Sequence, residues 1–553
     1  MSMTQEMNDG HRSAIFALSN EIVERIAEHS PISATDMGSS LNQDRLDDFS
    51  ITSLERLAGY YRDVLNRLSS MQPIDEIDRI AKSVIAERLG TRIALVESRE
   101  GIVTFGAIAS PSTAIRQVFE LMPKSTNEDF SNIESRLRDV SHSLKSWRSS
   151  LEQVYAEGHK TARRQVLLVS EQLRKTSEGG YQQFVKGFSE SDALLNAARE
   201  AEAGALEMAN WMRETLAPQS DPEDAVGKAR YEIWAKNFTG ADLDLLATYQ
   251  WGVEDLARIT ARAKAVGEKI LPGAQSLQQV AEFCEQDSLH QINGEDNLLQ
   301  ALKDFTEASI VALDGKYFDV DPRMRFCDAR LAPEGSAAAP YYIPPSEDFS
   351  RPGITWYPTL GHTKFNFWHI ASTWYHEAVP GHHLQCATAI LEKDRLSRFQ
   401  RNEAWISGYG EGWALYAERF MDEIGAFEDP RYELGYLSGQ ALRAARVVVD
   451  IGMHLKLPNF TGGIWDAESA VDLLVEQAMV EREYAASEVD RYLSWPGQAI
   501  SYKVGEKVWL DVREAAKARL GSKFDIKNFH NYALKIGPMG LDALRAEIAE
   551  FQG

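Results

Sequence analysis

Apolar side chains recur along much of the chain in steps of three and four residues, the spacing of an amphipathic helix. The clearest stripe consists of Ile133, Leu137, Val140, Leu144, Trp147, Leu151 and Val154. Ser131 and Glu134 are spaced to form a capping box at its start. Four further segments show the same pattern without a cluster of catalytic residue types: residues 54–68, 77–96, 194–216 and 243–265. We therefore expect a helical scaffold that forms one wall of a cleft.

A proline-rich segment between Val320 and Thr359 interrupts the helical pattern. Seven prolines exclude a long helix there: Pro322, Pro333, Pro340, Pro344, Pro345, Pro352 and Pro358. Strand-forming residues lie between them, namely Tyr341, Tyr342, Ile343, Trp356 and Tyr357. Because proline confines strands to sheet edges, one interpretation is an edge strand that holds an extended substrate by main-chain hydrogen bonds. The other is a linker or cover loop, and the pattern favours neither.

Helical patterning resumes after this segment and continues to the end of the chain. The 553 residues exceed a single small core, so we expect either two lobes or one large helical body. The predicted fold class is mainly α with a small β edge element. We place the boundary between a helical scaffold, residues 1–315, and a region of short strands followed by helices, residues 316–553.

The chain is strongly acidic, which narrows the classes of partner. It has 59 Lys and Arg against 82 Asp and Glu, a net charge of -23, and a pI near 5.1. Such a field repels phosphate backbones and anionic lipid, so we expect no binding to nucleic acid or to membrane surfaces. A negatively charged cleft would favour neutral or cationic substrates. Nothing in the composition predicts the oligomeric state.

Cysteine usage and the first residues predict a soluble, cytoplasmic protein. The three cysteines, Cys284, Cys327 and Cys386, are odd in number and widely spaced, which indicates no disulfide framework. Residues 1–11 are polar and lack the apolar stretch of a signal peptide. No run of about 18 apolar residues is found anywhere in the sequence.

The segment Tyr375–Gln385, with the sequence YHEAVPGHHLQ, contains three histidines and one glutamate within eight residues. Zinc hydrolases commonly carry His-Glu-x-x-His on a helix, where the two rings bind one ion and the Glu acts as a base. Here His382 follows His376 by six positions. On a regular helix this is a rotation of about 600°, so the two rings would diverge by about 120°.

The residues between the two histidines explain how the rings could still meet. Pro380 lacks the N–H that would bond the carbonyl of His376, and Gly381 tolerates unusual dihedral angles. We predict a helical bulge that swings His382 toward His376. His383 is the competing ligand, but on a straight helix it would lie roughly 10.5 Å along the axis from His376. A buried helix with a simple bend is disfavoured, because burying so many ionisable groups without a ligand is costly.

A zinc ion held by two imidazoles requires a third protein ligand. The best candidate is Glu411, which three glycines surround at positions 408, 410 and 412. Each glycine in a helix costs about 1 kcal/mol relative to Ala, which indicates a close approach of two backbones. We expect this approach to be made against the metal helix. Glu418, seven residues on, is the fallback ligand or a supporting residue behind the ligands; an ordinary helix with solvated glutamates is the alternative.

Two further polar clusters follow toward the C-terminus. Arg443, Arg446, Asp450 and His454 share one helix face, which is either a site wall or a solvated surface. The next cluster contains Arg491, Tyr492 and Tyr502. A Tyr hydroxyl or a His ring can donate to the oxyanion of a tetrahedral intermediate, and we favour Tyr502 over His454 for this role. We assign Arg446, Arg491 and Tyr492 to substrate binding, and Asp450 and His383 to support of the ligands.

Four motifs in this order resemble those of the bacterial domain-of-unknown-function 885 proteins, which look like distant relatives of the gluzincin zinc metallopeptidases. They are YHEAVPGHHLQ at 375–385, EGWALYAE at 411–418, RAARVVVDIGMH at 443–454 and PGQAISYKVG at 496–505. The resemblance covers residues 320–520. It implies a large, metallopeptidase-like helical body around a deep central cleft, and a zinc site with His376, His382 and Glu411 as ligands and Glu377 as base. The sequence departs from the broader gluzincin pattern by a two-residue insertion between the two histidines, which affects the geometry of the ligands.

The resulting hypothesis is a zinc-dependent hydrolase that cleaves amide bonds in short peptides or small amides, with Glu377 accepting a proton from water. Two alternatives remain. Two histidines and one carboxylate also make the metal site of non-haem iron oxygenases. A helical binding protein with a purely structural metal is the other, although such a site has no need of the Glu377 base.

Overall fold

The computed structural model describes residues 13–333 and 339–553 and is mainly helical, as predicted. The long stripe around Leu144 lies on α7 (Asn127–Ala156), and all seven of its apolar residues are buried. The helix begins earlier than expected, because Thr126 and Asp129 form the capping box. Glu134 lies one turn further along and pairs with Arg138 instead. Several residues at the start of this helix are polar, so periodicity alone did not locate its first turn.

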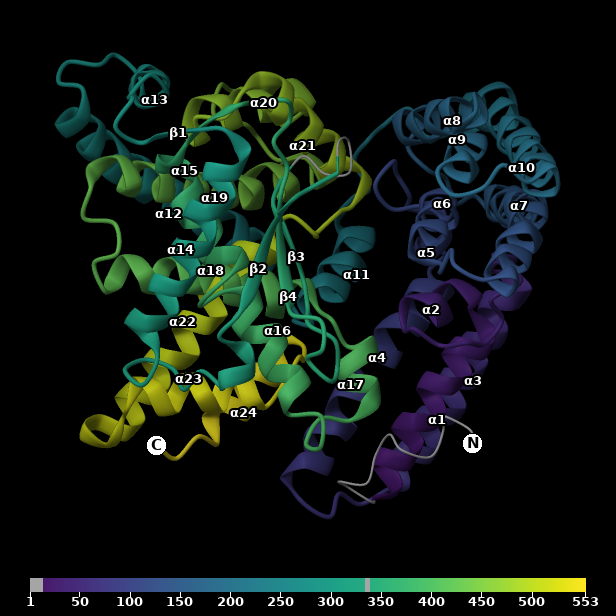
Figure 1. Cartoon of the computed structure of the whole chain (residues 1–553), viewed down its shortest axis with the longest axis horizontal. Coiled ribbons are helices and arrows are strands. Elements are labelled where there is room, and N and C mark those ends of the chain that lie inside the picture. Colours follow the sequence, from purple (N-terminus) through teal and green to yellow (C-terminus); the bar gives the residue numbers. More distant parts are fainter. Residues whose placement is uncertain (1–12, 334–338) are drawn as a thin grey trace.

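Figure 1 shows a small lobe beside a larger body. The small lobe has its own hydrophobic cluster, in which α10 packs along α7. Its elements are α2 (Pro31–Asp36), α5 (Glu100–Val103), α6 (Pro111–Leu121), α7, α8 (Arg163–Ser177), α9 (Gly180–Lys186), α10 (Asp192–Trp211), the π-helix η1 (Met212–Leu216) and the 3-10 turn η2 (Ala217–Gln219).

The larger body contains both ends of the described chain. Its helices are α1 (Ala14–His29), α3 (Ile51–Ser70), α4 (Glu76–Glu97), α11 (Lys228–Thr239), α12 (Leu245–Ile270), α13 (Leu277–Glu285), α14 (Glu295–Leu313), α15 (Phe367–Glu377), α16 (His382–Leu391), α17 (Arg398–Glu403), α18 (Ser407–Glu423), α19 (Pro430–His454), α20 (Ala467–Ala478), α21 (Arg482–Ser494), α22 (Ser501–Leu520), α23 (Ile526–Lys535) and α24 (Leu541–Ala549), with 3-10 turns η3 (Pro322–Met324) and η4 (Gly521–Lys523). Side chains of α1, α3 and α4 share its core with the C-terminal helices. The core of the larger body therefore combines helices from both halves of the chain.

The proline-rich segment forms a small sheet, in line with the predicted β element. Its strand order is β2-β4-β3, with β2 (Cys327–Leu331) parallel and β3 (Tyr341–Ile343) antiparallel to the central β4 (Gly353–Tyr357). A second pair joins β1 (Gln291–Asn293) to β5 (Lys364–Asn366), which leads directly into α15. β3 is thus an edge strand, as expected for a strand flanked by prolines.

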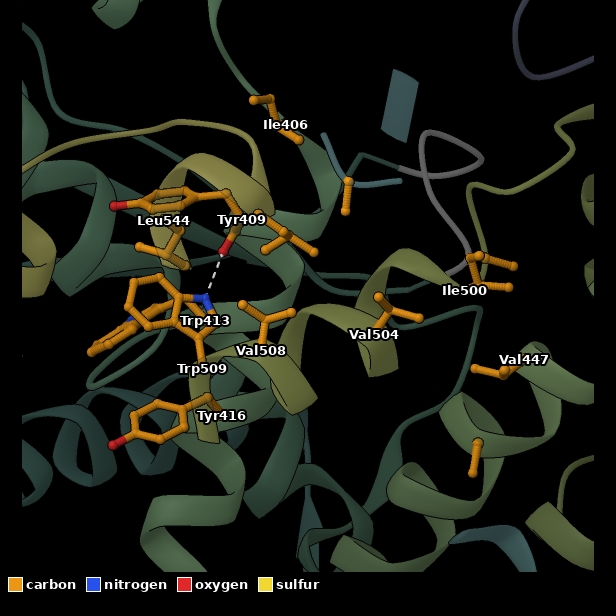
Figure 2. Close-up of a cluster of buried hydrophobic side chains, with 14 of the residues drawn as sticks. Ile406, Tyr409, Trp413, Tyr416, Val447, Ile500, Val504, Val508, Trp509 and Leu544 are labelled. Carbon is orange, nitrogen blue, oxygen red and sulfur yellow. Dashed lines mark hydrogen bonds between the residues drawn. The ribbon is translucent and has the colours of Figure 1, made fainter. Parts of the chain in front are cut away.

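Close contact between α18 and α22 explains why Gly412 and Gly505 are glycines. A Cβ on Gly412 would lie 2.5 Å from the Cα of Gly505, and one on Gly505 would lie 2.1 Å from the carbonyl oxygen of Gly408. Figure 2 shows the apolar packing around this crossing, including a hydrogen bond of 3.2 Å from Trp509 Nε1 to the carbonyl of Tyr409. The predicted close approach is present, but its partner is α22 and not the metal helix.

Two buried histidines connect elements of the body as neutral rings. His530 Nδ1 donates to the carbonyl of Tyr317 at 3.0 Å, and its Nε2 accepts from the Tyr416 hydroxyl at 2.7 Å. His454 Nε2 donates to the carbonyl of Tyr492 at 3.1 Å, and its Nδ1 accepts from the N–H of Val226 at 3.3 Å. Burial lowers the pKa of His530 to about 3 and that of His454 to about 4.

These two histidines predict a loss of stability in mild acid. Above about pH 6.5 both states of the chain hold neutral rings, so neither histidine changes the free energy of unfolding. As pH falls from about 6.5 to 4, the unfolded chain binds protons that the folded chain excludes, which costs roughly 3 kcal/mol per ring at most. We expect urea unfolding midpoints to fall between pH 7 and pH 5, and to fall less in His530→Gln. Equal decreases in both proteins would contradict this role for His530.

Candidate metal centre

The turn that joins α15 to α16 brings His376 and His382 together. α15 ends at Glu377 and α16 begins at His382, so the sequence YHEAVPGHH breaks the helix where a bulge was predicted. The N–H of Gly381 bonds the carbonyl of Tyr375 at 3.0 Å, and that of His383 bonds the carbonyl of Ala378. A Cβ on Gly381 would lie 1.9 Å from the carbonyl oxygen of His376, so this tight return requires glycine. The two imidazole centroids end 4.8 Å apart.

Glu411, on the neighbouring helix α18, closes the group. One of its carboxylate oxygens, Oε2, lies 3.2 Å from His376 Nε2 and 3.4 Å from His382 Nε2. The loop before α16 is fixed to α18 by a hydrogen bond of 2.9 Å from Trp413 Nε1 to the carbonyl of Pro380. Residues from three helices, α15, α16 and α18, therefore present two imidazoles and one carboxylate to a common point.

Glu418 supports His376 from behind. Its Oε1 accepts a hydrogen bond of 2.8 Å from His376 Nδ1, and its Oε2 accepts one from Ser372. Glu418 is 1% exposed, so it lies too deep in the protein to take part in substrate contact. A carboxylate on the far nitrogen of a ligating histidine fixes the ring orientation and leaves Nε2 free for a metal. This placement matches the supporting role that the sequence offered as one of two possibilities.

Glu377 lies farther from the two imidazoles than Glu411 does, but still close enough to count as a possible metal ligand. One of its carboxylate oxygens is within 4.8 Å of ring nitrogens of both His376 and His382. Among the described residues it forms no ion pair with either ring, whereas Glu411 contacts both. Burial raises the pKa of Glu377 above its usual value.

The donor set fits a zinc ion. Tetrahedral coordination with bonds of 2.0–2.1 Å places ligand atoms about 3.3 Å apart, and the two separations made by Glu411 are 3.2 and 3.4 Å. The shifted pKa values of His376 and Glu411 also fit a bound cation. Burial alone lowers the pKa of His376, but hydrogen bonds to Glu411 and Glu418 outweigh it and raise that pKa to about 9. The same rings hold the pKa of Glu411 well below its usual range despite burial. The site thus stabilises a positive charge between its carboxylates.

His383 is occupied elsewhere, which separates the two candidate ligands. Its Nε2 donates to the carbonyl of Met324 at 2.8 Å, and its Nδ1 accepts from the Tyr342 hydroxyl at 2.9 Å. Burial lowers its pKa to about 4, so the ring is neutral. A Cβ on Gly353 would lie 2.6 Å from His383 Nδ1, so that glycine leaves room for the ring. His383 therefore connects α16 to the small sheet, and only His382 of the pair faces His376.

A cavity of about 1550 Å³ opens onto the metal-binding group. His376, Glu377, His382 and Glu411 all line it. The edge strand β3 and the prolines that follow it also line it, which favours the substrate-lining interpretation of that segment over a remote linker. Helices α19 and α22 complete the wall, with α19 set close to α15 because Gly435 packs on the carbonyl of Trp368.

Two of the more distant candidates reach this cavity. Tyr502 lines it, with its ring nearly parallel to that of His376 at a centroid distance of 6.4 Å. Burial raises the pKa of Tyr502 to about 12, so the hydroxyl keeps its proton and can donate it in a hydrogen bond. Arg446 lines the cavity behind this ring, with its guanidinium carbon 4.8 Å from the ring centroid.

The structure does not bring the other four candidates to the cavity lining. His454 has both ring nitrogens bonded to main-chain groups, so it has no donor for an oxyanion. Asp450 accepts from the Tyr231 hydroxyl at 2.9 Å and from the N–H of Gly497 at 3.0 Å. Burial raises the pKa of Asp450 to about 7.

The remaining two, Arg491 and Tyr492, contact Glu488 instead of facing the cavity. Arg491 Nη2 lies 2.9 Å from Glu488 Oε2, and the Tyr492 hydroxyl donates to the same oxygen at 2.6 Å. Both side chains therefore hold the partner of Arg446 and support that residue. Their positions do not favour direct contact with a substrate.

Two further residues line the cavity: Trp405, which the sequence did not single out, and Cys386, a nominal ligand candidate because it lies four residues after His382. Trp405 is 53% exposed, lies 6.2 Å from His382 between ring centroids, and packs on Gly410. No periodicity marks it, although the glycine five residues later accommodates its ring. Cys386 is half-buried and also lines the cavity. Burial raises the pKa of its thiol to about 12, which disfavours a thiolate ligand.

Solved structures share this fold. A putative lipoprotein from Colwellia psychrerythraea matches with a TM-score of 0.85 and 22% identity, over 97% of this chain and 98% of that chain. A putative lipoprotein of unknown function from Shewanella oneidensis matches with a TM-score of 0.78 and 18% identity, over 98% of this chain and 100% of that one. At these identities the likeness establishes the fold alone.

These neighbours contradict the cytoplasmic location expected from the sequence, because both are described as putative lipoproteins. The expectation used the polar character of residues 1–11, which lie outside the described residues. In the described ranges no helix is long and apolar enough to cross a membrane.

No curated protein matches the chain. A family profile described as "Bacterial protein of unknown function (DUF885)" matches residues 31–548 and so includes the cavity, the metal-binding group and both lobes. The chain belongs to this family of bacterial proteins of unknown function.

Proposed function

We propose that this protein is a zinc-dependent hydrolase that cleaves amide bonds in short peptides or small amides. The observation that carries the proposal is the convergence of His376, His382 and Glu411 at the wall of a large cavity, with Glu377 beside them. His376 and His382 would hold the ion through Nε2, with Glu411 as the third ligand. The resemblance of YHEAVPGHH to gluzincin metallopeptidase motifs supports the same assignment.

When bound, zinc acts as a Lewis acid that polarises a carbonyl group and makes water acidic enough to react near neutral pH. Glu377 accepts the proton of the attacking water and passes it to the leaving nitrogen. Tyr502 donates its hydroxyl hydrogen bond to the developing oxyanion, a role that its high pKa suits. Glu418 holds His376 in orientation throughout.

The cavity indicates the form of the substrate. The edge strand β3 can pair with an extended main chain, which favours a peptide lying along this wall. Trp405 offers an exposed aromatic face next to His382. The neighbours' description as putative lipoproteins favours a location outside the cytoplasm for this chain as well.

Non-haem iron and structural-metal interpretations are disfavoured by Glu377. A purely structural site is closed, whereas this group opens onto a cavity with a buried carboxylate next to it. A screen of dipeptides to hexapeptides by mass spectrometry tests the proposal. We expect hydrolysis by the zinc-loaded protein, loss of hydrolysis with a chelator, recovery with zinc, and no oxygen consumption. A zinc-loaded protein that cleaves nothing in the screen would refute the hydrolase proposal, and oxygen uptake with iron would favour an oxygenase.

A further inference from the structure

Two arginines lie in the wall of the cavity next to the metal-binding group. Arg443 and Arg446 lie about one turn apart on α19, and both line the cavity. The Arg446 guanidinium carbon is 4.8 Å from the centre of the Tyr502 ring, and the His376 ring lies 6.4 Å from that of Tyr502 between centroids. A single aromatic ring thus separates this guanidinium from the metal-binding imidazole.

Arg446 shares its carboxylate partner with a second arginine. Arg446 binds Glu488 through Nη2 at 2.7 Å and Nε at 3.1 Å, and Arg491 shares the same carboxylate. Glu488 therefore serves two guanidiniums. Arg443 donates to the carbonyl of Gly439 at 3.3 Å, and among the described residues it forms no ion pair within 4.0 Å.

Unused donors point to a missing anion. Arg446 Nη1 and Arg443 Nε are buried and have no hydrogen-bond partner among the described residues. Arg446 and Arg491 share one carboxylate in a chain whose net charge is -23, so the arrangement runs against the general composition. Arg443 interacts electrostatically with Glu377 and Glu418 but, among the described residues, forms no ion pair with either. Buried cations without partners are costly, which favours a ligand that completes them.

We propose that Arg443, with Arg446 behind it, binds a free carboxylate of the substrate, so that the hydrolysed bond lies next to a C-terminal carboxylate. The proposal rests on the proposed amide hydrolysis and names its substrate class: peptides and N-acyl amino acids that lose their last residue. Guanidinium groups match carboxylates in charge and planar geometry. The closeness of Arg446 to the metal-binding group leaves room for about one residue between the reacting carbonyl and the anion, because successive Cα atoms are about 3.8 Å apart.

The test compares acetyl-Phe-Ala with its C-terminal amide, which differs only in the charged group. Binding of each to zinc-loaded Glu377→Gln protein is measured by calorimetry, so that turnover does not interfere. We expect the acid to bind at least tenfold more tightly, since hydrogen bonds between charged groups are worth about one to two decades of affinity. Arg443→Gln or Arg446→Gln, added to the same background, is expected to reduce the preference to less than about threefold.

A matched control tests whether the preference for the acid comes from Arg443 and Arg446 or from the overall positive charge of the cavity arginines. Arg351→Gln removes the same charge from another part of the cavity lining and should retain the preference. Arg446→Gln leaves Glu488 paired with Arg491, and thermal unfolding checks that each variant folds. Equal binding of acid and amide by the parent, binding of neither, or an undiminished preference in both arginine variants would overturn the proposal.

Hydrolysis by the wild-type protein distinguishes this inference from the proposed function. Equal cleavage of acid and amide would retain the hydrolase and remove the carboxylate site. Preferential binding of the acid without any cleavage would retain the carboxylate site and remove the hydrolase.

Discussion

Replacing Glu377 with Gln is expected to reduce kcat by about 10²–10⁴-fold and to leave zinc content unchanged. The glutamine keeps the size of the side chain but cannot accept a proton from water. Glu377 takes no part in the contacts that Glu411 makes with His376 and His382, so metal binding should survive the substitution. Steady-state kinetics on a substrate from the peptide screen, together with metal analysis of the same preparation, measures both quantities.

A second carboxylate in the cavity provides the control. Glu282 also lines the cavity wall but is exposed, and Glu282→Gln should retain activity within a few-fold. Full activity in Glu377→Gln would eliminate this residue as the base. A parallel loss of zinc and activity would instead identify Glu377 as a ligand.

Replacing Gly505 with Ala is expected to destabilise the protein by about 3 kcal/mol or more and to weaken zinc binding. The new Cβ would lie 2.1 Å from the carbonyl oxygen of Gly408 and 2.6 Å from the Cα of Gly412. Both contacts are with backbone, so no side-chain rotation relieves them, and the cost reaches the upper end of the usual overpacking range. Separation of α18 from α22 would also move Glu411 relative to Tyr502, because each lies near this crossing.

Gly59→Ala is the matched control, because Gly59 lies within α3 and a Cβ there would meet nothing within 4 Å. That substitution should stabilise the protein by about 0.5–1 kcal/mol. Thermal unfolding midpoints and zinc titrations of the two variants make the comparison. A Gly505→Ala protein as stable as Gly59→Ala would contradict the close helix crossing.

Local chemistry in the sequence was sufficient to predict the meeting of His376, His382 and Glu411. The Pro380–Gly381 pair cannot continue a helix, and the delayed histidine makes sense only if the chain turns back there. What the pattern did not show was the form of that turn. The helix ends and restarts, and a bulge within one helix was the wrong form.

Helical periodicity was less informative about which residues a side chain contacts. Arg446, Asp450 and His454 share one face of α19, yet along 25 residues that face passes from the cavity to other buried surroundings. Spacing gives the direction of a side chain but not the neighbour it meets. The glycines around Glu411 posed the same difficulty, because they indicated a close backbone without showing that it belongs to α22.

Anomalous X-ray scattering at the zinc absorption edge, from a crystal of the zinc-loaded protein, tests the central claim most directly. We expect one strong peak between the Nε2 atoms of His376 and His382 and the carboxylate of Glu411. A zinc-loaded crystal with no peak at that point, or with the metal bound only by other residues, would contradict the account.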